Sequence, residues 1–206
     1  YIAKERSVVF DEINMVVDDP KSYQWIMLES NLFERFPGKY PVYGSKETLN
    51  KIGRKELFSF YNRFYVPSNM IISVAGDIPD LRTKLEKRFS KFQRNSTIKR
   101  PVYDEKPLKA NIIGTKSLPT EQAYMTLAFR TVGRAHEDSY LLDVLETVLG
   151  KGQSSRLFNE IRVKRGLAYG IAAYNNCHRD YGYFAVSLAT NKKNIEKCKN
   201  LIFKEL

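Results

Sequence analysis

Charged and apolar side chains share one face of the helix predicted at the start of the chain. At 100° per residue, positions 5, 8, 9, 12, 15 and 16 fall on a single face, and they read Glu, Val, Val, Glu, Met and Val. The apolar members predict that this face is covered. A covered carboxylate needs a cation, because removing an unpaired carboxylate from water is costly. Glu5 and Glu12 therefore fit either a structural ion pair, for example with Lys4 or Arg6, or a metal or catalytic site.

The remaining hydrophobic pattern predicts an α+β protein. Helices are expected at residues 2–18, 21–34, 54–64, 80–92, 137–149, 154–164 and from about 191. Strands are expected at residues 70–75, 110–115, 122–131, 167–176 and 181–189. The economical architecture is two sandwich-like domains, each an antiparallel or mixed sheet with helices packed on one face. The strand at 181–189 is expected at a sheet edge, where an extended peptide could add as a further strand.

A polar segment at residues 93–109 carries two prolines and shows no periodicity, which is typical of a linker. The predicted organisation is a first domain at 1–94, a linker at 95–107 and a second α+β domain at 108–206. The first residue is not Met, and the first predicted helix has no cap before it. We therefore expect a fragment of a longer protein.

Composition excludes few classes of function. With 43% hydrophobic residues in 206, the chain can form a packed core. The net charge of +11 is spread along the sequence, and the densest basic run, at 84–100, matches no nucleic-acid-binding module. No apolar stretch approaches the roughly 18–20 residues that span a bilayer, and the start has no signal-peptide core. A bacterial cytoplasmic location is the default expectation.

Five further residues carry no predicted chemistry. Cys177 and Cys198 lack the spacing of a zinc knuckle and are expected to be reduced thiols. His136 is expected at a helix start and His178 in a strand turn, neither as a metal ligand. Gly152 is expected to allow a turn between two helices.

Three longer motifs carry a family resemblance. They are KERSVVFDEINMVVDDP, PVYGSKETLNKIGRKELFSFYNRFYVPSNMIISVAGDI and LGKGQSSRLFNEIRVKRGLAYGIAAYNNCHRDYGYFAVSLAT. In order and spacing they resemble the pitrilysin or insulinase-type (M16) zinc metallopeptidases, and most closely the shorter members related to mitochondrial processing peptidase. The resemblance covers nearly the whole chain and implies two α+β domains.

The resemblance implies roles for four residues. Glu12 matches the family's third zinc ligand, and Glu5 matches a carboxylate that supports the metal site from behind the ligands. Arg162 and Tyr169 match a pair that faces the zinc across the substrate chamber. There Tyr169 would donate to the developing oxyanion and Arg162 would anchor the peptide. The plain alternative is that Tyr169 packs in the sheet and Arg162 pairs with an acidic residue such as Glu160. The family also has a glycine-rich turn at the place of Gly152, and the resemblance implies contact with the substrate there as the alternative to a plain turn.

The sequence departs from the family pattern in one respect, because it contains no His-x-x-Glu-His motif. The resemblance implies Zn²⁺ in the intact protein and none bound by this fragment alone, with the other ligands before Tyr1. It implies a zinc-dependent metalloendopeptidase that hydrolyses peptides enclosed between two homologous halves or subunits. The expected partners are a peptide substrate, the missing N-terminal segment, the remaining C-terminal half and a homo- or heterodimer partner, without nucleic acid or a membrane span. The alternative is a non-catalytic homologous subunit with a structural or substrate-presenting role.

Overall fold

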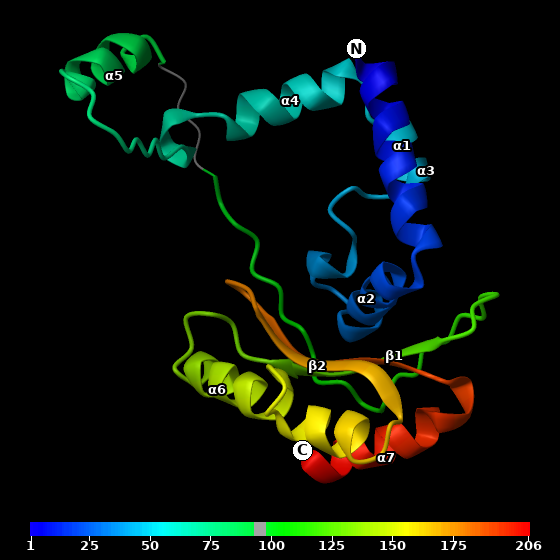
Figure 1. The fold of residues 1–206 in the computed structure, drawn as a ribbon. Helices are drawn as coiled ribbons and strands as arrows, with labels where there is room; N and C mark the ends of the chain where they lie inside the picture. Colours follow the sequence, from blue (N-terminus) through cyan, green and yellow to red (C-terminus); the bar gives the residue numbers. More distant parts are fainter. Residues whose placement is uncertain (93–97) are drawn as a thin grey trace. The chain divides into compact units, whose positions relative to one another are not determined.

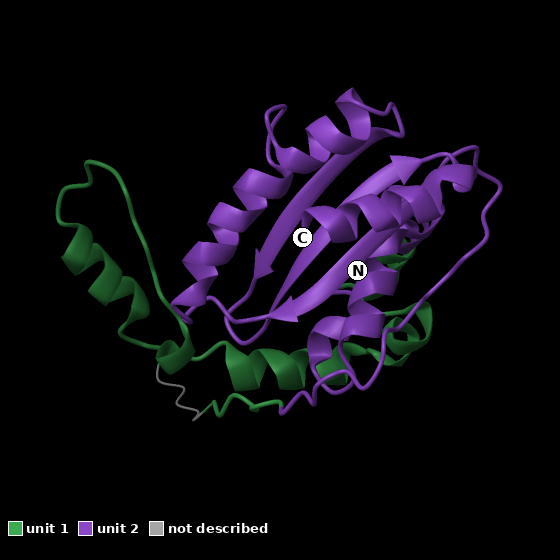
Figure 2. Cartoon of the chain, turned by 90° about the horizontal axis from the view of Figure 1, so that it is seen from below, with its two compact units in different colours: residues 1–10, 43–103 green, residues 11–42, 104–206 purple. Residues whose placement is uncertain are grey.

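Two compact units make up the chain, as Figure 2 shows in colour. The computed structural model describes residues 1–92 and 98–206. Unit 1 contains residues 1–10 and 43–103, and unit 2 contains residues 11–42 and 104–206. The α+β class is confirmed, since helices surround one antiparallel sheet. The part of the predicted linker at 98–107 forms neither helix nor strand, and residues 95–97 lie outside the described residues.

Unit 2 is built on a three-stranded antiparallel sheet. Its strands are β1 (Ala123–Thr131), β2 (Ala168–Cys177) and β3 (Gly182–Thr190), in the order β1-β3-β2. All three were expected from the sequence. The predicted edge position of residues 181–189 is wrong, because β1 pairs along one side of β3 and β2 along the other. An added peptide strand therefore finds no free edge on β3.

Side chains of β3 alternate between two cores, as the period of a strand requires. Phe184, Val186 and Leu188 point into the larger core, whereas Tyr183 and Ala185 point into the smaller one. The larger core is completed by buried residues of the neighbouring helices and of β2: Leu149, Leu157, Ile161, Ala168, Ile171, Ala173, Cys198 and Ile202. Both faces of the sheet are therefore covered within unit 2.

Helices form a layer on each face of this sheet. On one face lie α6 (Asp138–Gly150), the short helical segment η3 (Phe158–Val163) and α7 (Ile195–Glu205), as Figure 1 shows. On the other face lies α2 (Pro20–Leu32), whose Trp25 packs edge-on against Tyr174 with ring centres 5.1 Å apart. Two short 3₁₀ turns, η1 (Pro37–Lys39) and η4 (Lys192–Asn194), complete the unit.

Unit 1 consists of helices and extended segments. Its helices are α3 (Lys46–Lys51), α4 (Arg54–Phe64) and α5 (Leu81–Phe89), with a 3₁₀ turn η2 at Pro67–Asn69 and the first half of α1 (Ile2–Asp18). Among its described residues, Val66 is the one hydrophobic side chain that is fully buried. Unit 1 thus has little core of its own.

Two predicted strands are not formed. Residues 70–75 in unit 1 and 110–115 in unit 2 are extended but pair with no strand of the described chain. Met70, Ile71, Ile72 and Val74 are all exposed. A strand is stabilised by its ladder to a neighbour, so an apolar β-branched run without a neighbour stays an extended segment.

The predicted covered face of α1 is also wrong for this chain. Ile13 is the buried residue of the helix, and it lies on a different side from the predicted stripe. Glu5, Val8, Glu12 and Met15 are exposed. Burial within this chain therefore gives no desolvation argument for a cation at Glu5 or Glu12.

Candidate functional site

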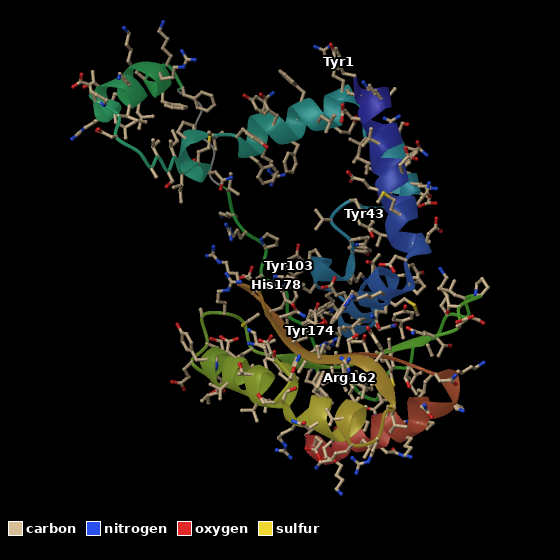
Figure 3. The ribbon with its side chains drawn as sticks, viewed as in Figure 1. Tyr1, Tyr43, Tyr103, Arg162, Tyr174 and His178 are labelled. Carbon is tan, nitrogen blue, oxygen red and sulfur yellow. The ribbon has the colours of Figure 1, made fainter. Side chains whose placement is uncertain are left out.

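Arg162 lies in a π-helical turn, where the sequence predicted a regular helix at 154–164. The backbone N–H of Lys164 donates to the carbonyl of Asn159, five residues earlier, at 2.9 Å. Such turns are rare in proteins, but many of those that do occur lie at functional sites. Figure 3 labels Arg162 on the segment that leads into β2.

Tyr169 sits at a β-bulge near the start of β2. Ala168 lies opposite Thr190 and Gly170 lies opposite the neighbouring Ala189, so Tyr169 is the extra residue. Its side chain is 78% exposed, whereas Ala168 and Ile171 on either side of the bulge are buried. A bulge redirects a side chain out of the regular pleat. Tyr169 therefore does not pack in the sheet, and the alternative that gave it a plain packing role is wrong.

The structure brings Arg162 and Tyr169 together. The guanidinium carbon of Arg162 lies 5.1 Å from the ring centre of Tyr169 and 4.9 Å from that of Phe158. Both distances are within the range of cation–π attraction. The two rings contact the guanidinium without using its N–H donors, and no described residue is seen to accept from them, so they can donate to a ligand.

Glu160 does not neutralise Arg162. Its carboxylate accepts instead from Lys164 and from Arg165 Nη1, the latter at 2.5 Å. These donors lower the pKa of Glu160 below its ordinary value. Within residues 1–92 and 98–206, Arg162 has no carboxylate partner, so its charge is unpaired.

Arg162 and Tyr169 line one open pocket of about 580 Å³. It lies at the end of the sheet where β1 and β2 begin and β3 ends. The lining residues come from four elements and their loops: Glu121, Gln122, Arg162, Gly166, Leu167, Ala168, Tyr169, Ala189, Thr190, Asn191 and Asn194. The cationic, phenolic, amide and carboxylate groups among them suit a ligand with carbonyl, amide and charged groups, as in a peptide.

Glu5 and Glu12 lie on α1 and are both exposed. Among the described residues, no group of three or more His, Cys, Asp or Glu side chains could hold a metal ion. His136 accepts from the backbone N–H of Asp138 at 3.2 Å before α6, and the ring of His178 stacks on Tyr181 at 4.4 Å. The described residues of this chain therefore do not complete a zinc site by themselves.

The glycine-rich turn after α6 forms as predicted. Gly152 has φ +82°, in the left-handed region that favours glycine, and the hydroxyl of the buried Ser155 donates to its carbonyl at 2.8 Å. Gly150 has another reason to be glycine, because a Cβ there would lie 2.0 Å from the backbone nitrogen of Ala173. The turn therefore lets α6 end directly against β2.

Comparison with known families decides the identity. The family profile described as the peptidase M16 inactive domain matches residues 51–206. The chain belongs to the peptidase M16 family. The M16 resemblance seen in the three sequence motifs is thereby confirmed.

Curated relatives of this M16 chain are named uncharacterized zinc proteases. The one from Bacillus subtilis, YmxG, is 31% identical over 205 residues, which cover 98% of this chain and 49% of the relative. The one from Mycobacterium tuberculosis, Rv2782c, is 36% identical over 193 residues, 90% of this chain and 43% of the relative. The chain thus spans about half of the length of the curated relatives it matches.

Solved structures show the same fold. The peptidase M16 inactive domain from Pseudomonas fluorescens superposes with a TM-score of 0.86 at 22% identity, over 98% of this chain and 49% of that one. A protease from Helicobacter pylori gives a TM-score of 0.84 at 20% identity, over 98% of this chain and 51% of that one. In the described parts of this M16 chain, no helix is long and apolar enough to cross a membrane.

The sequence identified Arg162 and Tyr169 only through the resemblance. The π turn and the bulge that expose them leave no periodic signal. Gln122 and Asn191, which share their pocket, were missed because a polar residue next to a strand end is common in any loop.

Proposed function

We propose that this M16 chain is part of a zinc-dependent metalloendopeptidase, and that the pocket around Arg162 and Tyr169 contacts the peptide to be cut. The observation that carries the proposal is the unpaired guanidinium of Arg162, held on two aromatic rings beside the exposed Tyr169. A cation without a carboxylate partner, next to a phenolic donor, is suited to oxygen atoms of a bound peptide.

In this proposal the two side chains have different tasks. Arg162 binds a carbonyl oxygen or a carboxylate of the peptide, because its N–H donors are not used by any described acidic residue. Tyr169 donates its hydroxyl proton in a hydrogen bond to the carbonyl oxygen that becomes negative during attack. Both groups act by orienting the peptide and by stabilising charge.

Glu12 is the proposed zinc ligand of this chain, and Glu5 supports the metal site from the same helix. The other ligands and the base would come from the part of the family length that this chain does not span. When bound, zinc would lower the pKa of a water molecule so that it can attack a peptide carbonyl. The proposed domain division at 1–94 and 108–206 would assign Glu12 to the metal-bearing half. A bacterial cytoplasmic location stays a prediction.

The test is zinc content and peptide hydrolysis of the protein produced from its complete reading frame. Glu12→Gln is expected to abolish stoichiometric zinc and activity, whereas Asp11→Asn, a neighbouring exposed carboxylate on α1, should change neither. Full zinc and activity in Glu12→Gln would disprove the role of Glu12. A complete protein without zinc or hydrolysis would favour the non-catalytic subunit instead.

A further inference from the structure

The outer side of α6 is apolar, although the inner side of this helix already packs on the sheet. Leu149 is buried, and Leu142 packs against the larger core of unit 2. At 100° per residue, a second row of large apolar side chains falls on a different side of the helix. This outer stripe consists of five residues that are 40% to 75% exposed: Tyr140, Leu141, Val144, Leu145 and Val148. A helix that is apolar nearly all round is typical of a helix with packed layers on both sides.

Helix α7 shows how an outer side that meets water differs. Figure 1 shows α6 and α7 on the same face of the sheet. In α7 the outer positions with the spacing of the outer stripe are exposed and polar: Glu196, Lys197, Asn200 and Lys204. Phe203 lies beside this polar row, with its ring centre 6.4 Å from that of Phe129. The outer stripe of α6 is therefore not a general feature of this helical layer, and an exposed apolar patch of this kind marks an interaction site.

The charges on α6 and just before it are all negative. Residues 135–150 contain four carboxylates and no Lys or Arg, in a chain whose net charge is +11: Glu137, Asp138, Asp143 and Glu146. Asp138 Oδ2 lies 3.6 Å from His136 Nδ1, and Asp143 Oδ1 accepts from Asn175 Nδ2 at 2.7 Å. Within residues 1–92 and 98–206, none of the four forms a salt bridge with Lys or Arg. The surface that covers the outer stripe therefore needs apolar side chains with positive charges beside them.

We propose that the outer stripe is the docking surface for a basic amphipathic helix of the same protein, supplied by the part of the family length that this chain does not span. The length of the relatives supports this source. The chain covers about half of its curated relatives and of the solved structures that share its fold, so they contain a further stretch of about the same length. The proposal concerns packing and does not rest on the proposed function.

Charge selects this occupant over a second α6. Two outer stripes packed against each other would bring two sets of four carboxylates together, and like charges across an interface are unfavourable. A helix with apolar residues three and four positions apart can lie along the stripe. Lys or Arg at the borders of that helix would pair with carboxylates such as Asp138 and Asp143, which have no basic partner among the described residues.

The first experiment measures thiol labelling of the protein from its complete reading frame. Val144→Cys places a thiol within the outer stripe, and Asn200→Cys places one on the polar outer row of α7 as the matched control. Labelling by N-ethylmaleimide is read residue by residue with mass spectrometry, so Cys177 and Cys198 stay in place. The thiol of Val144→Cys is expected to react at least about tenfold more slowly than that of Asn200→Cys, because a covered thiol reacts only when the structure opens. Equal rates would overturn the proposal.

The second experiment identifies what covers the stripe. The photoreactive residue p-benzoylphenylalanine replaces Val144 in the complete protein, and the cross-linked peptides are sequenced after irradiation. The expected product is a cross-link within one polypeptide to a peptide that contains Lys or Arg and lies outside the 206 residues. A product of doubled mass on a denaturing gel, a cross-link to a segment without basic residues, or no cross-link would each overturn the proposal.

A variant that does not fold is replaced by another on the same stripe. Leu141→Cys and p-benzoylphenylalanine at position 141 serve this purpose, because Leu141 is 66% exposed. Neither experiment uses zinc or peptide hydrolysis. A protein that shows the expected cross-link and no hydrolysis would reject the proposed function alone, and an active protein with a freely labelled outer stripe would reject the docking surface alone.

Discussion

The guanidinium of Arg162 lies 5.1 Å from the ring centre of Tyr169, and both residues sit where regular structure is interrupted. A π-helical turn carries the arginine and a β-bulge carries the tyrosine. Each irregularity interrupts the regular backbone hydrogen bonding of its element. Together they present two polar side chains to one pocket. Seven residues of separation in the sequence thus become a direct contact.

Tyr169→Phe tests the proposed hydrogen bond to the substrate. In the protein from the complete reading frame, loss of one donor to a developing oxyanion is expected to lower kcat by about 10²-fold. Stability should change by less than about 0.5 kcal/mol, because the side chain is exposed. Tyr140→Phe, on a tyrosine that is 75% exposed on α6, is the control. Equal activity of Tyr169→Phe and wild type would remove Tyr169 from the proposed function.

Glu105 holds a loop of unit 2 through its carboxylate. It accepts from the backbone N–H groups of Glu34, Arg35 and Phe36, and Arg130 Nη2 lies 3.5 Å away. Burial raises the pKa of Glu105, but these donors outweigh it and the pKa is lower than usual. The charged form is therefore favoured by folding.

Unit 2 should lose stability in acid for this reason. A depressed folded pKa gives a contribution that is present above the unfolded pKa of about 4.3 and is lost as the pH falls through the folded pKa. Glu105→Gln is expected to lower the free energy of unfolding by about 1–3 kcal/mol at pH 7. In strong acid the variant and wild type should have the same free energy of unfolding, because Glu105 is then uncharged. Urea unfolding at both pH values measures this. Glu34→Gln, on an exposed side chain, should match wild type at neutral pH.

Gly150→Ala tests the close approach of α6 to β2. The added Cβ would meet the backbone nitrogen of Ala173 at 2.0 Å and its Cβ at 2.5 Å. The helix must shift, so a loss of about 1–3 kcal/mol in the free energy of unfolding is expected. Gly170→Ala is the control, because nothing lies within 4 Å of its Cβ position. A neutral Gly150→Ala would show that this contact is not close in solution.

Tyr183→Phe tests the polar link between β3 and α2. The Tyr183 hydroxyl donates to Oε1 of Glu29 at 2.8 Å, and burial, followed by this bond, raises the pKa of Tyr183. The free energy of unfolding of the variant should be about 1 kcal/mol lower than that of wild type at pH 7. Because the folded pKa is raised, wild type should also lose stability as the pH rises above about 10, and the variant should lose less.

The fluorescence of Trp25, the one tryptophan of the sequence, follows this unfolding, since the residue packs on the sheet through Tyr174. Tyr124→Phe, on β1, is the control tyrosine variant. If the free energies of unfolding of wild type and Tyr183→Phe fall in parallel as the pH rises above about 10, the proposed role of the Tyr183 hydroxyl is contradicted.

Sequence patterns predicted the strands of unit 2 because each finds its partner within the chain. The same patterns failed at residues 70–75 and 110–115, where an apolar run is present but no neighbouring strand is described. Periodicity reports which residues avoid water and says nothing of which segment will cover them. The order β1-β3-β2 was missed for the same reason, since pairing is a long-range property.

The candidate site was predictable only in part. Hydrophobic periodicity drew attention to Glu5 and Glu12 for a burial that α1 does not have in this chain. Arg162 and Tyr169 followed from family motifs, while their exposure depends on one extra residue in a strand and one in a helical turn. Single-residue insertions of this kind leave the composition and the average period unchanged.

The sparse core of unit 1 has a practical consequence for anyone who handles this polypeptide. Phe58 and Phe60 of α4 and the run from Met70 to Val74 present apolar side chains to solvent. Extended β-branched segments of this kind associate edge to edge with copies of themselves. At the concentrations used for crystallisation, self-association is therefore expected to start from unit 1. A solubility tag, or charged substitutions at positions 71 and 72, should keep the chain in solution.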